Sequence, residues 1–218
     1  MNSLLLAMSF LAASPALPPP RAEVSAHAVA VAGPPALRIE VPQAAQYAGG
    51  ERFVLFGNAD CELHVFVEAD QAKRIRRLYW VQFEDYLPGL PDARYTYGKS
   101  DRRTMRWGQK AWIASGFGKS DFATRPGSDR EHLRGILKRA GYSWPPTMMQ
   151  TRIVRLLDDP KGTGFGRREL MLIYAEDLAV SGEDFEALGG EGEDTDRWRA
   201  IEPALAARAA QAFSVTAP

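Results

Sequence analysis

Residues 61–69 read CELHVFVEA, and residues 75–87 read IRRLYWVQFEDYL. In the first stretch apolar side chains occupy every second position, which is the pattern of a β-strand with one buried face. The buried face would carry Cys61, Leu63, Val65, Val67 and Ala69. The polar residues 70–73 lie between the two stretches, so the sequence predicts an antiparallel β-hairpin.

A hairpin centred near Ala72 predicts a definite register. Val67 would lie opposite Arg77, and Cys61 opposite Phe83, on the core face. On the other face His64 would lie opposite Trp80 and Glu62 opposite Gln82. A slip of one residue would exchange the faces, so this register decides which side chains meet.

Outward from the hairpin, alternation and turn residues predict five further strands, at 37–42, 52–58, 104–115, 149–158 and 167–177. Residues 128–140 predict one helix, because Ser128 and Glu131 match a capping box and Gly141 follows the apolar stripe. Residues 170–174 are apolar on both faces, which indicates a central strand covered by that helix. The pattern predicts an α+β domain with a largely antiparallel sheet of about 6–7 strands.

The two ends of the chain differ in composition from residues 37–180, which we take as the core domain. Residues 4–13 form an apolar run of signal-peptide length, so residues 1–28 are predicted to be a leader and residues 29–36 a Pro/Ala-rich linker. A mature chain would begin near residue 17 or 29. Export to the periplasm or the exterior is therefore expected, with a cytoplasmic location as the alternative.

The C-terminal segment, residues 181–218, carries the charge asymmetry of the chain. Overall there are 27 basic and 27 acidic residues, but this segment has 3 basic and 8 acidic ones, and residues 1–180 have a net charge of +5. Such a segment can hang free in solvent, which charge runs usually do, or it can dock on the basic body. Apolar residues at helical spacing from Trp198 onward predict a C-terminal helix, interrupted or restarted at Pro203.

Several functional classes have no support in the sequence. The neutral charge disfavours nucleic-acid binding, and no apolar run is long enough to cross a membrane. One cysteine and three scattered histidines give no metal-ligand spacing, and no loop predicts a cofactor. The glycine-rich string at 162–166 is interpreted as a hairpin loop, and Cys61 as an inert core thiol.

The remaining candidate site is the polar face of the predicted hairpin. His64 beside Glu62 or Glu84 could perform acid–base chemistry, while Trp80, Gln82 and Tyr86 could contact a ligand. A solvated sheet face with no function is the alternative.

These patterns predict an exported, non-catalytic binding protein for an unknown small molecule or protein. Its ligand would meet that face or the loops at 88–103 and 159–166. The alternatives are a small enzyme, for instance a hydrolase, that uses His64 with Glu62 or Glu84, and a cytoplasmic regulator whose acidic tail covers its basic body.

Overall fold

The computed structural model describes residues 19–97, 102–120, 123–190 and 195–217. In these residues the chain is mostly β-sheet, with two α-helices and one short 3₁₀ helix. The largest sheet is antiparallel and has seven strands, as the sequence predicts. Their order across this large sheet is β4 (Gln46–Leu55), β5 (Ala59–Ala69), β6 (Ile75–Tyr86), β12 (Arg168–Asp177), β10 (Thr147–Leu156), β9 (Lys110–Lys119) and β8 (Arg102–Thr104).

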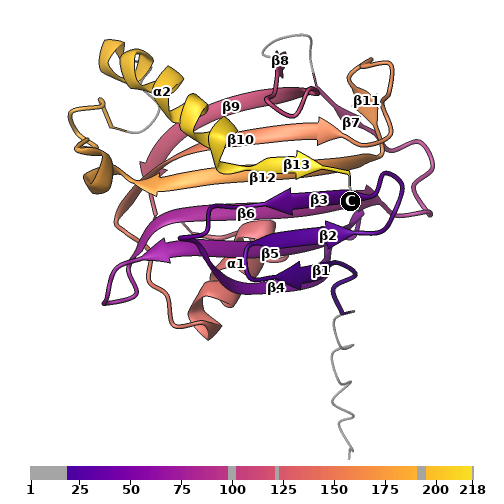
Figure 1. Ribbon diagram of the computed structural model, residues 1–218, viewed down its shortest axis with the longest axis horizontal. Helices are drawn as coiled ribbons and strands as arrows, with labels where there is room; N and C mark the ends of the chain where they lie inside the picture. The colour runs from indigo at the N-terminus through magenta and orange to yellow at the C-terminus, as the bar shows by residue number, and fades with distance from the viewer. Residues whose placement is uncertain (1–18, 98–101, 121–122, 191–194, 218) are drawn as a thin grey trace, which may run out of the picture.

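A second sheet and helix α2 (Asp196–Ala212) cover one face of the large sheet, and α1 (Asp129–Arg139) lies on the other (Figure 1). The small sheet has the order β1 (Glu23–Ser25), β2 (Ala28–Val31), β3 (Leu37–Glu40) and β13 (Ser214–Thr216). A two-stranded pair joins β7 (Tyr95–Thr96) to β11 (Phe165–Gly166), and the 3₁₀ helix spans Leu178–Ser181. Two hydrophobic clusters result, one on each face of the large sheet.

The β5–β6 hairpin forms, but the predicted register is wrong by one residue over most of its length. Cys61 lies opposite Glu84 and not Phe83, and His64 lies opposite Val81 and not Trp80. The predicted register holds only next to the turn, where Ala69 pairs with Ile75. It shifts by one residue at the next pair, in which Glu68 lies opposite Arg77. The extra residue is Arg76, a β-bulge that moves every later side chain of β6 to the opposite face.

Helix α1 begins where the sequence predicts. Ser128 is its N-cap, and its hydroxyl accepts a hydrogen bond from the backbone N–H of Glu131 at 3.3 Å. Leu133, Ile136 and Leu137 are buried, and they pack over β4 and β5 at one side of the sheet. The helix therefore does not cover the central strand β12 as expected, and no helix of the described residues covers the α1 face of β9, β10 and β12.

The C-terminal segment docks on the protein, which corrects the preference for a solvated tail. Trp198, Leu205 and Ala209 of α2 are buried in the cluster between the two layers, and β13 pairs with β3. Arg208 forms a salt bridge with the buried Glu176 of β12. The apolar stripe of α2 outweighs the acidic residues before it, because burying it removes a large area from water.

Three further expectations differ from the structure. Val29 and its neighbours form β2 inside the stretch expected to be a linker. The predicted strand 104–115 is two strands, because Gly108 takes a φ of +80° in a turn between β8 and β9. Helix α2 continues through Pro203. The predicted leader run, residues 4–13, lies outside the described residues.

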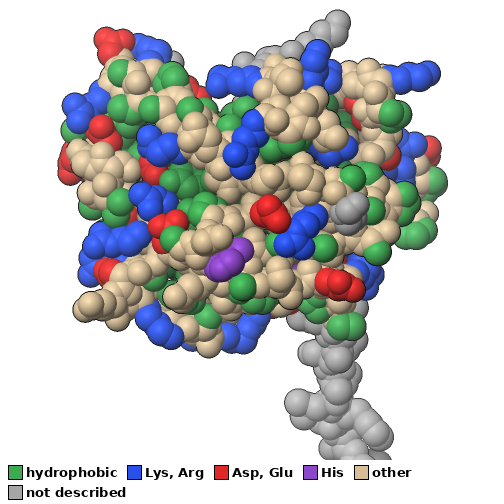
Figure 2. Space-filling view, in the orientation of Figure 1, with side chains coloured by type: hydrophobic (Ala, Val, Ile, Leu, Met, Phe, Trp, Pro, Cys, Tyr) green, Lys and Arg blue, Asp and Glu red, His purple; other side chains and the backbone are tan. Residues whose placement is uncertain are grey.

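Neither helix in the described residues is long and apolar enough to cross a membrane. On the face of the molecule that carries α2 and the small sheet, acidic and basic side chains are interspersed (Figure 2).

Candidate functional site

The β-bulge divides the predicted site between the two faces of the large sheet. Glu62 and His64 point towards the small sheet, whereas Trp80, Gln82 and Glu84 point towards the α1 face. His64 and Glu84 therefore cannot act together, because the sheet separates them. Tyr86 is half-buried and packs against Tyr95 at a ring-centroid distance of 4.4 Å.

Glu62 and His64 do meet, in a buried network. His64 Nε2 donates to Glu62 Oε1 at 3.0 Å, and Tyr47 Oη lies 3.1 Å from His64 Nδ1. The backbone N–H groups of Arg21 and Ala22 also donate to Glu62, at 2.8 and 2.7 Å. The exposed fraction is 0% for His64 and 1% for Glu62, so neither side chain reaches solvent.

The surroundings of Glu62 and Tyr47 determine which of the two side chains is ionised. Burial would raise the pKa of Glu62, but the hydrogen bonds from His64 and from the two backbone N–H groups lower it to about 2. Burial, together with the Glu62 charge, raises the pKa of Tyr47 to about 12. Glu62 is therefore an ionised acceptor that ties the N-terminal residues to the sheet. Gly50 is required nearby, since a Cβ there would lie 2.6 Å from His64 Nδ1.

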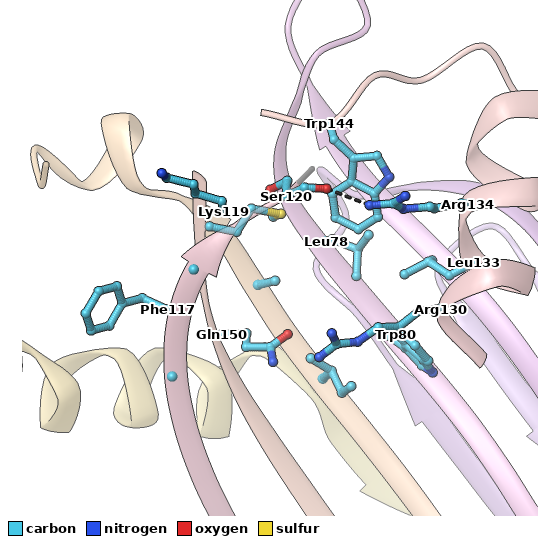
Figure 3. Close-up of a pocket in the computed structure, with 15 residues that line it drawn as sticks. Leu78, Trp80, Phe117, Lys119, Ser120, Arg130, Leu133, Arg134, Trp144 and Gln150 are labelled. Atoms are coloured by element: carbon cyan, nitrogen blue, oxygen red, sulfur yellow. Dashed lines mark hydrogen bonds between the residues drawn. The ribbon is translucent and has the colours of Figure 1, made fainter. Parts of the chain in front are cut away.

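On the opposite face lies a groove that the sequence did not predict. Its volume is about 380 Å³, and it continues into a second hollow of about 300 Å³. Helix α1 forms one wall and β9 the other, while β6, β12 and β10 form the floor (Figure 3). The two hollows share Trp80, Gly116, Arg130, Gln150 and Ile173, so we treat them as one elongated groove.

The floor of the groove is apolar and tightly packed. Leu78, Trp80, Met148, Ile173 and Ala175 lie along it, and each has less than a tenth of its surface exposed. Of the predicted ligand-contacting residues, Trp80 alone is among the residues that line the groove. Its indole N–H donates to Gln82 at 2.7 Å, which holds the ring in place beneath the groove.

Glycines leave space along the β9 wall. Gly116 and Gly118 lie opposite Gln150 and Met148 on β10, and both line the groove. A Cβ added at either glycine would have no other heavy atom within 4 Å, and neither residue has a positive φ. Backbone strain therefore does not explain these glycines, and their lack of a side chain widens the groove.

The polar side chains of the groove are mainly cationic. Among its described lining residues, Arg130, Arg134 and Arg152 place positive charge there and Asp129 carries the one negative charge, whereas the ammonium group of Lys119 lies over Phe185 on the other face of the sheet. Arg134 donates to the backbone oxygen of Ser120 at 2.7 Å and so links α1 to the end of β9. Arg130 extends across the groove towards Gln150 (Figure 3).

Farther along the same face, Glu84 and Glu169 lie directly opposite each other on β6 and β12. Glu84 accepts hydrogen bonds from Gln82 at 2.6 Å and from Tyr95 at 3.0 Å, and Glu169 accepts one from Tyr97 at 2.7 Å. Burial and the charge of Glu84 raise the pKa of Glu169 to about 8, and burial also raises that of Glu84. The pair therefore holds a proton at neutral pH. Its hydrogen bonds with Tyr95 and Tyr97 attach β7 and the residue that follows it to the large sheet.

Cys61 has no exposed surface, and burial raises the pKa of its thiol, as expected for an inert core cysteine. In the described part of the chain, no three histidine, cysteine, aspartate or glutamate side chains are grouped so that they could hold a metal ion.

Comparison with known proteins identified no relative of this chain. No family model, no curated protein and no solved structure matches this chain.

Proposed function

We propose that this protein is an exported, non-catalytic binding protein whose groove between α1 and β9 holds a small, largely apolar molecule. The supporting observation is the groove itself, which joins a buried apolar floor to a few polar side chains at its rim. Its volume lies within the range typical of small-molecule sites, roughly 300–1,000 Å³.

Filling the groove provides the direct test. We expect Gly116→Leu to lower the affinity for N-phenyl-naphthylamine, an uncharged apolar fluorophore, at least about tenfold, because the new side chain takes the place of the ligand. Stability should be unchanged or slightly higher, since glycine weakens a strand. Fluorescence titration measures the affinity, and thermal unfolding measures the stability.

The matched control is Gly89→Leu. Gly89 lies outside the groove, has no positive φ, and would likewise place its Cβ in open space. This variant should bind the fluorophore as the wild type does. If the wild type does not bind the fluorophore, or if both variants bind it equally well, the groove is not the binding site.

The alternative is a small hydrolytic enzyme that uses His64 with Glu62, and their contact at 3.0 Å is the observation in its favour. Against it, both ring nitrogens of His64 are hydrogen-bonded within the protein, and the side chain has no exposed surface. A general base must come within hydrogen-bond reach of its substrate. The binding function therefore has the stronger support.

Export makes a separate prediction about the mature N-terminus. Cleavage near residue 28 would remove β1 together with the N–H groups of Arg21 and Ala22 that bind Glu62. Cleavage near residue 16 would leave them in place. We therefore expect mass spectrometry of the exported protein to place its first residue near 17, and an intact Met1 would contradict export.

A further inference from the structure

The chemistry of the groove indicates which apolar molecules it would accept. Its two hollows together form an elongated space, with apolar side chains of β6, β12 and β10 beneath it. A linear hydrocarbon chain fits such a space, because it can remove apolar surface from water along the whole floor. A floor of this kind does not by itself distinguish a neutral molecule from a charged one.

The charged side chains at the rim of the groove distinguish a neutral ligand from a charged one. Three cationic side chains, those of Arg130, Arg134 and Arg152, and the carboxylate of Asp129 line the groove among the described residues, so its charge favours an anion. Arg134 donates to the Ser120 backbone at the end of the β9 wall. Lys119 lines the groove without directing its charge into it, because its ammonium group lies 5.2 Å from the ring centroid of Phe185 on the other face of the sheet. Arg130 lines both hollows and extends over the floor, which makes it the principal candidate for contact with a ligand (Figure 3).

An arginine beside an apolar floor favours a ligand whose head group is an anion. The guanidinium group can donate two parallel hydrogen bonds to a carboxylate or phosphate, and a partly desolvated site strengthens them. The side-chain amide of Gln150, on the floor opposite Arg130, adds a neutral donor. A cationic head would instead face like charges.

We propose that the groove binds a single-chain anionic amphiphile, with its hydrocarbon chain on the floor and its carboxylate or phosphate head at Arg130. This inference rests on the proposed binding function and specifies its ligand class.

The test compares probes that share one chain and differ in the head. Dodecanoate, dodecyl phosphate, dodecanol and dodecyltrimethylammonium, each below its micelle concentration, compete with N-phenyl-naphthylamine for the wild-type protein. We expect the two anions to compete at concentrations about tenfold lower than dodecanol, and the cation to compete least. Inorganic phosphate without a chain should not displace the fluorophore, which separates a lipid anion from a free phosphate.

Two variants assign the effect to one side chain. Arg130→Gln should weaken dodecanoate about tenfold and leave dodecanol and the fluorophore unchanged, since the amide keeps a donor but loses the charge. Lys138→Gln makes the same charge change at an exposed position on the same helix, outside the groove, and should have no effect.

The outcomes separate the two proposals. If the fluorophore binds and Gly116→Leu blocks it, but all four heads compete equally, the anionic ligand class is wrong and the binding function stands. If the anions compete better and Arg130→Gln changes nothing, the assignment of the head to Arg130 is wrong. If the wild type binds neither the fluorophore nor any amphiphile, both proposals fail.

Discussion

Replacing Glu62 by alanine should destabilise the protein by about 3 kcal/mol at neutral pH, the cost typical of removing one partner from a buried charged pair. The carboxylate accepts hydrogen bonds from His64 and from the backbone N–H groups of Arg21 and Ala22. Alanine would leave the buried His64 ring and the partly buried N–H groups of Arg21 and Ala22 without this acceptor. Urea unfolding measures the loss, and Glu40→Ala is the control because Glu40 forms an exposed pair with Arg38.

The pH dependence of Glu62 follows from its lowered pKa. The folded value is about 2 against an ordinary 4.5, so the folded protein holds the ionised form more firmly than the unfolded chain does. The stabilisation is present above about pH 4.5 and is lost as the pH falls towards 2. Glu62→Gln lacks this contribution, so its difference from the wild type should shrink over that range. A difference that stays constant with pH would contradict an ionised Glu62.

The sequence was sufficient to predict the strands of the β5–β6 hairpin but not the way in which they pair. Alternation fixes the phase of a strand only where one face is polar, and here both faces are buried. Phe66 and His64 point into one layer, while Val65 and Trp80 point into the other. With apolar side chains on both faces, nothing in the pattern of β6 reveals that Arg76 is an extra residue.

The groove could not be predicted for a different reason. Its walls and floor come from α1 and four strands, and they meet only because the sheet places β6 beside β12 and because α1 packs to one side of the sheet. The sequence shows that residues 116 and 118 are glycines, but it does not show that they line a groove. That depends on which face of the sheet they occupy and on which element lies across from them. Trp80 was predicted to contact a ligand, and it lines the groove, although on a different face from His64.

Replacing Glu169 by glutamine should have the opposite effect to a change at Glu62. The folded pKa of Glu169 is about 8 against an ordinary 4.5, because burial and the charge of Glu84 disfavour its ionised form. The wild type therefore loses stability as the pH rises from about 4.5 to about 8, since the unfolded chain ionises first. Glutamine has no proton to lose, and its carbonyl oxygen can still accept the hydrogen bond from Tyr97.

The expected result is a gain of about 4 kcal/mol at pH 8 that shrinks towards zero near pH 4.5, measured by urea unfolding across that range. Glu176→Gln is the matched control, because Glu176 lies on the same strand and is equally buried but binds Arg208, Tyr174 and Ser181. Its carboxylate is paired with a cation, so this substitution should destabilise the protein. If the two substitutions change stability in the same direction, the shared proton of Glu84 and Glu169 is not the cause.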